Sequence, residues 1–167
     1  MQERTITVNG ISKTFSVTGW RIGYVTASPH ITAAVKKVHD FLTVGAAAPL
    51  QQAAANVINS CHEYYKSLND FYTVRRDYFI KILEDVGFKC NRPFGAYYIM
   101  ADIESFNMGN DIEFSKYLTK DIGVAVVPAS SFYRSKHSEG SKMVRFCYCK
   151  RMDTLEAASQ RLSKLKR

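Results

Sequence analysis

The feature that most constrains the fold of this chain is a long amphipathic segment near its middle. In residues 64–86 the apolar side chains recur three and four residues apart, a spacing that keeps them on one face of an α-helix. Gly87 follows, at the position where a left-handed residue often ends a helix. The pattern predicts one long helix, and the character of the sequence changes on either side of it.

Shorter helical and extended patterns lie before and after this segment. Helices are predicted from Pro29, over 49–59, over 111–120 and over 153–166. Strands are predicted over 5–8, 21–26, 96–101, 124–127 and 144–149. Asp153 followed by Glu156 resembles a capping box for the last helix. The order predicts an α/β chain in which residues 1 to about 80 form one unit and the rest form a compact α+β unit.

Composition and charge exclude several classes of protein. The chain has 167 residues, is 46% hydrophobic and carries a formal net charge of +8. Its cations are dispersed and no RNA-binding strand signature is present, so we expect no nucleic-acid partner. No apolar run approaches the ~18 residues of a spanning helix, and the polar first residues do not resemble a signal peptide. We expect a soluble, cytoplasmic protein without a membrane partner.

The cysteines and histidines predict neither a metal site nor a disulfide. No Cys-x-x-Cys pair exists, and the four histidines, His137 among them, are scattered without metal-ligand spacing. Cys147 and Cys149 lie two residues apart on a predicted strand and should share one face. We expect free thiols in a reducing compartment.

Two basic residues lie close together in the sequence: Lys13 in the loop between the first two predicted strands, and Arg21 at the start of the second strand. Lys13 follows the first strand, and α/β proteins bind ligands at such sheet ends. Arg21 begins the second strand between Gly19 and Gly23, which permit close backbone approach. A planar guanidinium suits bidentate contact with phosphate. Taken alone, a lysine such as Lys13 is most often a solvated loop residue, and an arginine such as Arg21 is most often a salt-bridge partner.

A third basic residue, Arg145, lies inside the otherwise apolar predicted strand 144–149. Burying a guanidinium is costly unless a carboxylate pairs with it. That carboxylate belongs either to an internal Asp or Glu or to a bound ligand. The residues alone favour the internal ion pair.

Four blocks, in order, resemble the motifs of class I pyridoxal 5'-phosphate (PLP) aminotransferases of fold type I. Residues 9–24 (Asn-Gly-Ile-Ser-Lys-Thr-Phe-Ser-Val-Thr-Gly-Trp-Arg-Ile-Gly-Tyr) resemble the family's lysine signature. Residues 93–98 (Pro-Phe-Gly-Ala-Tyr-Tyr) and 123–132 (Gly-Val-Ala-Val-Val-Pro-Ala-Ser-Ser-Phe) resemble two later blocks, and 144–146 (Val-Arg-Phe) resembles the strand of the substrate arginine. The resemblance covers essentially the whole chain.

The resemblance implies a role for each of the three basic residues. Lys13 matches the lysine that forms the Schiff base with PLP and moves the proton between the substrate α-carbon and the cofactor. Arg21 matches the arginine on the cofactor phosphate, and Arg145 matches the arginine that binds the substrate α-carboxylate. Residues 1–79 would be the C-terminal remnant of the large cofactor-binding domain, and 80–167 the small C-terminal α+β domain.

Several cofactor-binding features of the family have no match in this sequence. Complete members of the family are far longer, and twelve residues precede Lys13 in this chain. The phosphate loop, the aromatic residue stacked on the ring and the Asn and Tyr on the ring hydroxyl have no counterpart. Neither does the Asp that keeps the pyridine nitrogen protonated, which is the protein's main electronic contribution.

The implied function is transfer of an amino group between an amino acid and a 2-oxo acid, of aspartate or aromatic type, by the C-terminal part of a complete or split enzyme. One alternative is a truncated, catalytically incompetent fragment that acts as a folding or association module. Another is a PLP-dependent lyase on the same scaffold, such as a carbon–sulfur lyase. The expected partners are the substrates and either a second copy, as in a homodimer, or a missing N-terminal half.

Overall fold

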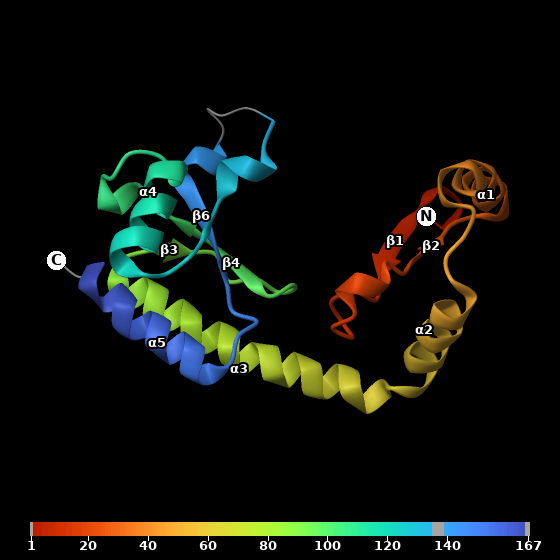
Figure 1. Ribbon diagram of the computed structural model, residues 1–167, viewed down its shortest axis with the longest axis horizontal. Helices are drawn as coiled ribbons and strands as arrows, with labels where there is room; N and C mark the ends of the chain where they lie inside the picture. The colour runs from red at the N-terminus through yellow and green to blue at the C-terminus, as the bar shows by residue number, and fades with distance from the viewer. Residues whose placement is uncertain (1, 135–138, 166–167) are drawn as a thin grey trace. The chain divides into compact units, whose positions relative to one another are not determined.

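The computed structural model describes residues 2–134 and 139–165, so His137 lies outside the described residues. The chain divides into two compact units, Met1–Leu68 and Asn69–Arg167. Helices and small sheets occur in both (Figure 1), which confirms the predicted mixed α/β class. The division falls within helix α3 (His62–Val86). The domain boundary expected at residues 79/80, a statement about the family's large and small domains, stays a prediction.

The first unit begins with an antiparallel hairpin. Strand β1 (Thr7–Gly10) pairs with β2 (Gly23–Thr26), so that Asn9 lies opposite Tyr24. Every residue of both strands is exposed. The buried apolar side chains among the described residues of this unit lie at one end of the hairpin and on the second helix, and they are Ile11, Ile22 and Ala54.

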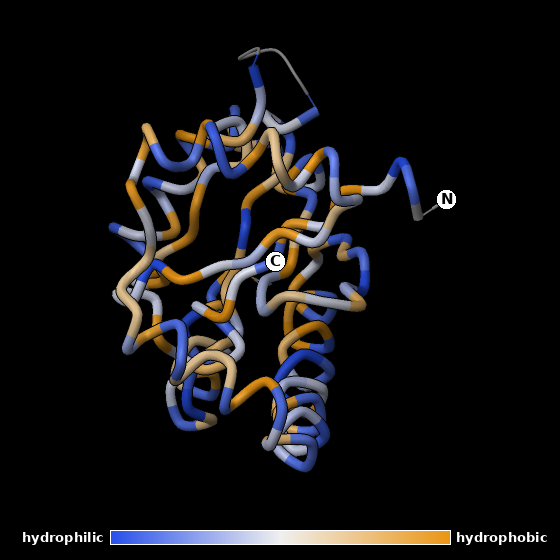
Figure 2. The backbone as a smooth tube through the Cα atoms, turned by 90° about the vertical axis from the view of Figure 1, so that its right-hand side faces the viewer, coloured by the Kyte–Doolittle hydropathy of each residue, from blue (hydrophilic) through white to orange (hydrophobic). Residues whose placement is uncertain are grey.

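Two helices follow the hairpin, and each has a proline in its first turn, where the missing N–H has no helical partner to lose. They are α1 (Pro29–Thr43) and α2 (Ala48–Ser60), close to the predicted positions. Both polar and apolar residues occur along the helices (Figure 2). Helix α1 buries none of its residues, and its apolar side chains Val38, Phe41 and Leu42 are exposed.

Helix α3 confirms the strongest sequence prediction. Its apolar face supplies Phe79, Leu83 and Val86 to the core of the second unit. Gly87 has φ +110°, a conformation that residues with a Cβ rarely adopt, and it follows the last helical residue as predicted.

The second unit contains an antiparallel four-stranded sheet. Its strand order is β3 (Lys89–Cys90), β4 (Tyr98–Asp102), β6 (Met143–Cys147) and β5 (Val127–Pro128). Burial alternates along β6: Val144 and Phe146 are buried, whereas Arg145 and Cys147 are half-buried on the other face. The core therefore lies on the face that carries Phe146.

Two further helices, α4 (Asp111–Tyr117) and α5 (Met152–Leu162), belong to the second unit and contribute side chains to its core. Helix α4 continues as a π-helical turn over Leu118–Ile122. Short 3₁₀ helices complete the described structure, at Gln2–Arg4, Thr18–Trp20, Glu104–Phe106, Ala129–Phe132, Glu139–Lys142 and Ser163–Leu165.

The predicted strand 124–127 is wrong for most of its length. The π-helical turn extends the preceding helix to Ile122, and Gly123 ends it with φ +81°. The chain reaches the sheet at Val127, so β5 has two residues. The predicted strand 96–101 also begins later than expected. Ala96 has φ +60°, which is not a strand conformation, and β4 starts at Tyr98.

The capping box predicted at Asp153 and Glu156 is also wrong. Helix α5 begins at Met152 after Arg151, and the Asp153 carboxylate accepts a hydrogen bond from the adjacent amide of Thr154 (2.7 Å). A capping box does occur at α4, where Asn110 and Glu113 bind each other's backbone amides.

The last correction concerns Cys149. Strand β6 ends at Cys147, so Cys149 is not a strand residue. All four cysteines are free. None of the described helices is long and apolar enough to cross a bilayer.

Candidate active site

Lys13 lies on the loop that joins the two strands of the hairpin. The Ile11 amide donates a hydrogen bond to the Ile22 carbonyl (3.3 Å) and closes this loop at its base. Both isoleucine side chains are buried against α2. Residues 11–22 therefore form a connection with a fixed base, and Lys13 and Arg21 both belong to it.

Backbone and aromatic contacts hold the segment around Lys13. The Phe15 amide donates to the Ile11 carbonyl (3.1 Å), and the Val17 amide donates to the Ser12 carbonyl (3.0 Å). The Tyr64 hydroxyl donates to the Thr14 carbonyl (2.6 Å) from the start of α3. The Phe15 and Tyr64 rings stack with their centroids 5.4 Å apart. The exposed Lys13 side chain thus extends from a backbone that its neighbours anchor.

Arg21 has a left-handed backbone, with φ +55° and ψ +40°. It was expected to begin a strand, but β2 starts two residues later at Gly23. A left-handed conformation costs a residue with a Cβ roughly 1–3 kcal/mol, and such strain gathers at functional sites. The guanidinium donates one hydrogen bond through Nη1 to the Thr18 carbonyl (2.8 Å). Among residues 2–134 and 139–165 its other N–H groups have no partner.

Gly23 is required by the close approach of the two strands. A Cβ at this position would lie 2.8 Å from the Asn9 carbonyl oxygen, and real Cβ atoms essentially never come so close to another atom. On the same ladder, the Asn9 side-chain amide donates to the Tyr24 hydroxyl (3.1 Å). These contacts fix the hairpin end from which the loop extends.

Arg145 lies in the second unit, on β6, opposite Met100 of β4 and Val127 of β5. Its Cζ is 5.0 Å from the centre of the Tyr98 ring and 4.6 Å from that of Phe132. The internal ion pair favoured by the sequence is absent from the described part of the chain: no Asp or Glu there pairs with Arg145. Two aromatic rings hold the guanidinium, and its N–H donors stay available for a carboxylate.

The turn that carries Phe132 depends on a buried acid that the sequence analysis missed. Asp111 is 1% exposed, and its Oδ2 accepts a hydrogen bond from the Ser130 amide (2.7 Å). This bond ties the 3₁₀ turn Ala129–Phe132 to the first turn of α4. Asp111 is a positioning residue for Phe132, and through it for Arg145. An acidic residue in the first turn of a predicted helix gave no sign of this role, because such residues are common there.

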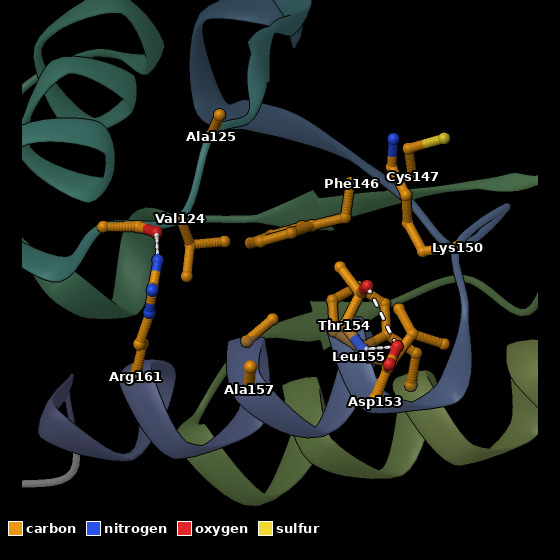
Figure 3. Close-up of a pocket in the computed structure, with 13 residues that line it drawn as sticks. Val124, Ala125, Phe146, Cys147, Lys150, Asp153, Thr154, Leu155, Ala157 and Arg161 are labelled. Carbon is orange, nitrogen blue, oxygen red and sulfur yellow. Dashed lines mark hydrogen bonds between the residues drawn. The ribbon is translucent and has the colours of Figure 1, made fainter.

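The second unit also contains a pocket of about 520 Å³ beside α5 (Figure 3). Its lining is mainly apolar, with Val124 and Phe146 facing Ala157 and Leu155 of the helix. Arg145 is not among its lining residues. No cluster of three or more metal-ligating side chains occurs within the residues that the structure describes.

The match of nearly the whole sequence to a known family shows where this chain belongs. The profile of the family described as aminotransferase class I and II matches residues 1–162. The chain belongs to the class I and II aminotransferases. The resemblance in the sequence blocks is thereby confirmed, although the profile match assigns no role to Lys13, Arg21 or Arg145.

Individual aminotransferases match almost the whole of this chain. The methionine aminotransferase of Escherichia coli (strain K12) is 34% identical over 165 residues, which are 99% of this chain and 42% of that protein. The structure of N-succinyldiaminopimelate aminotransferase from Mycobacterium tuberculosis superposes with a TM-score of 0.90 at 33% identity, over 99% of this chain and 43% of that one. For the aromatic aminotransferase of Pyrococcus horikoshii OT3 the TM-score is 0.87 at 34% identity, with 99% and 43% covered. This aminotransferase chain thus spans about two fifths of the length of the relatives it matches.

Residues 11–22, the lysine loop, carry the two groups that bind a phosphorylated aldehyde: an amine and a cation for the phosphate. An exposed amine at Lys13 and a guanidinium at Arg21 with donors to spare lie on one anchored connection. These two side chains fit PLP, the cofactor implied by the family, as the covalent attachment point and the phosphate ligand. Arg145 belongs to the other unit.

Proposed function

We propose that this chain is the C-terminal part of a PLP-dependent aminotransferase that moves an amino group between an amino acid and a 2-oxo acid. Membership of the class I and II aminotransferases supports the reaction class. The observation that carries the assignment to particular residues is the anchored loop with Lys13 and Arg21, together with an arginine on β6 that forms no ion pair with any described residue.

Lys13 is the covalent residue in this proposal. Its amine would hold the cofactor at the cofactor's carbonyl, and its Nζ would give a proton to the substrate α-carbon or take one from it. PLP, when bound, supplies a conjugated ring that accepts electron density from the substrate α-carbon. The anchors at Thr14 and Phe15 matter because proton transfer requires Nζ to stay within hydrogen-bond reach of the carbon.

Arg21 and Arg145 bind the two anionic groups of the reaction. The guanidinium of Arg21 binds the cofactor phosphate with the donors that Thr18 leaves free. The guanidinium of Arg145 binds the substrate carboxylate, while Tyr98 and Phe132 limit its side-chain freedom. A bidentate contact also orients the α-carbon, so Arg145 contributes positioning as well as affinity.

For the substrate we propose an aspartate or aromatic amino acid type. The similarity to the aromatic aminotransferase of Pyrococcus horikoshii OT3 supports the aromatic type. The exposed Tyr98 beside Arg145 offers a surface on which an aromatic side chain can stack.

The test is covalent labelling of the chain. PLP is added to the purified chain, the product is reduced with borohydride, and tryptic peptides are weighed. We expect label at Lys13, no label there in Lys13→Ala, and unchanged label in Lys36→Ala, which removes another exposed lysine of the same unit. Label spread evenly over the lysines, or retained after Lys13→Ala at another dominant position, would overturn the assignment. We expect weak binding, because the acid that protonates the pyridine nitrogen has no match in this chain.

Turnover provides the second readout. Preparations that label at Lys13 are assayed for amino transfer from aspartate or an aromatic amino acid to a dicarboxylic 2-oxo acid, alone and with a polypeptide that supplies the rest of the family's length. We expect transfer only with the added polypeptide, and a raised KM in Arg145→Ala. A KM unchanged by Arg145→Ala would remove this residue from the substrate site.

A second candidate function is that of a folding or association module without activity. It is favoured by the uncovered apolar side chains of α1, which include Phe41 at 94% exposure. Labelling at Lys13 followed by turnover would reject this candidate, whereas self-association without any labelling would support it.

A further inference from the structure

Two cysteines in the second unit, Cys147 and Cys149, lie against each other. Their sulfur atoms are 3.0 Å apart, and both side chains are half-buried. The pair belongs to the second unit, and the proposed amino transfer makes no use of it.

The backbone after β6 explains why these sulfur atoms meet. Cys147 is the last residue of β6, and the Tyr148 amide still pairs with the Tyr97 carbonyl (2.9 Å). The Lys150 amide then donates to the Tyr148 carbonyl (2.8 Å), which closes a three-residue turn with Cys149 at its centre. The turn takes Cys149 out of the strand and directs its sulfur toward Cys147.

We propose that Cys147 and Cys149 form a reversible dithiol–disulfide site that reacts with a low-molecular-weight disulfide. Even on a fully extended chain, residues two apart lie no more than roughly 6.8 Å apart between Cα atoms, which is within the range that a disulfide bridges. Because only Tyr148 separates the two cysteines, the small ring that the bond closes departs from relaxed disulfide geometry, so the bond should be strained and easily reduced. Labile disulfides of this kind are the exchangeable ones, in contrast to structural disulfides.

The reaction balances as two thiol–disulfide exchanges. One cysteine, as its thiolate, attacks a sulfur of the small disulfide; the S–S bond breaks, and the released thiolate takes up the proton that the cysteine lost. The second cysteine then attacks the mixed disulfide and releases the other small thiol. Two protein thiols are oxidised and one small disulfide is reduced to two thiols.

The surroundings predict how the rate depends on pH. Burial, followed by the contact with Cys147, raises the pKa of the Cys149 thiol to about 11, against the opposing charge of Lys150. Because the attacking species is the thiolate, closure should be slow at neutral pH and accelerate as the pH rises.

The site also neighbours the candidate substrate arginine. Cys147 is two residues from Arg145 on the same face of β6, and its cross-strand partner is Tyr98. The Tyr98 ring is one of the two that hold the Arg145 guanidinium. Closing the pair therefore acts on the strand that carries Arg145, although the dithiol chemistry itself does not depend on the proposed amino transfer.

The test uses the full chain and oxidised glutathione. Trypsin cleaves after Arg145 and Lys150, so the peptide 146–150 contains both cysteines and no others. After incubation and acid quenching, we expect this peptide to be lighter by two hydrogen atoms and to regain them with dithiothreitol. Cys147→Ser and Cys149→Ser should each carry one glutathione on the remaining cysteine, and the control Cys61→Ser should close like the parent.

A matched incubation in urea isolates the contribution of the fold. If the structure positions the pair, the folded chain closes several-fold more completely than the unfolded chain at the same pH. Glutathione on either cysteine of the parent peptide without loss of the two hydrogens would overturn the proposal. Equal closure in urea, or a disulfide between two chains, would overturn it as well.

Discussion

The Tyr64 hydroxyl donates a 2.6 Å hydrogen bond to the carbonyl of Thr14, the residue after Lys13. Residues 50 positions apart in sequence are joined by this contact, which ties the lysine loop to the start of α3. The ring of Tyr64 adds a stack against Phe15. One side chain thus holds the loop through both a polar and an aromatic contact.

Tyr64→Phe separates the two contacts. The ring stack stays and the hydroxyl is lost, so we expect the first unit to lose about 1 kcal/mol of unfolding free energy. The chain has one tryptophan, Trp20, in this same loop, so urea unfolding followed by its fluorescence reports on this unit. Tyr65→Phe is the control, because the Tyr65 hydroxyl has no hydrogen-bond partner among the described residues. Equal losses in both variants would show that the bond to Thr14 does not hold the loop.

Gly23→Ala tests the close approach of the two strands. The new methyl group would lie 2.8 Å from the Asn9 carbonyl oxygen, so the hairpin must open. Overpacking of this kind costs about 1–3 kcal/mol. Gly19→Ala is the matched control, because a Cβ there meets nothing within 4 Å. Fluorescence of Trp20 during urea unfolding compares the two variants, and a Gly23→Ala chain as stable as Gly19→Ala would contradict the geometry.

Asp77 makes the stability of the second unit depend on pH. The hydrogen bond from Arg76 is the main cause that lowers the pKa of the Asp77 carboxyl, and Arg92 adds a 2.8 Å ion pair. Because the pKa of Asp77 is lower in the folded state, its charge stabilises the folded chain at pH values above the pKa of the unfolded state. This stabilisation is lost as the pH falls through the folded-state pKa. The side chain of Asp77 is 40% exposed, so solvent screening limits the contribution to roughly 0.5 kcal/mol.

Asp77→Asn is the corresponding experiment. Circular dichroism during urea unfolding should show the variant less stable than the parent at pH 7, with the difference shrinking below about pH 4, where an unfolded aspartate takes up its proton. A difference that stays constant down to pH 3 would mean that the charge of Asp77 is not the cause.

Phe41→Ser tests the association expected from α1. Phe41 is 94% exposed beside Leu42 and Val38, so the isolated chain should self-associate through this patch. Analytical ultracentrifugation should show weaker association in Phe41→Ser. Phe94→Ser, which removes a phenylalanine that is 95% exposed in the second unit, should change nothing. A monomeric parent at high concentration would refute the role of the patch.

The sequence predicted helices well where the apolar spacing persists over several turns. Helix α3 was predicted to within two residues because its periodicity is long and Gly87 supplies a stop. Strand 124–127 was wrong because a π-helical turn continues the preceding helix to Ile122 and the left-handed Gly123 follows it, whereas the valines at 124, 126 and 127 favour a strand by local propensity. The capping box at Asp153 was wrong because helix α5 starts one residue earlier.

The candidate site was predictable in its residue types and not in its surroundings. A loop lysine and two arginines could be named from motifs, and the family is confirmed. The partners of Arg145 depend on strand register and on a turn held by Asp111, contacts that join residues far apart in sequence. Local sequence patterns carry no information about such pairings. The sequence therefore predicted an ion pair for Arg145, whereas the structure places two aromatic rings beside it.

The small buried cluster beneath the lysine loop has a consequence for how this chain comes apart. Ile11, Ile22 and Ala54 are the buried members of that cluster, whereas the sheet and helices around Arg145 bury a far larger set of side chains. Amide protons near Lys13 should therefore exchange with solvent at lower temperature than those of β6. On heating, we expect the loop that carries Lys13 to unfold before the strand that carries Arg145.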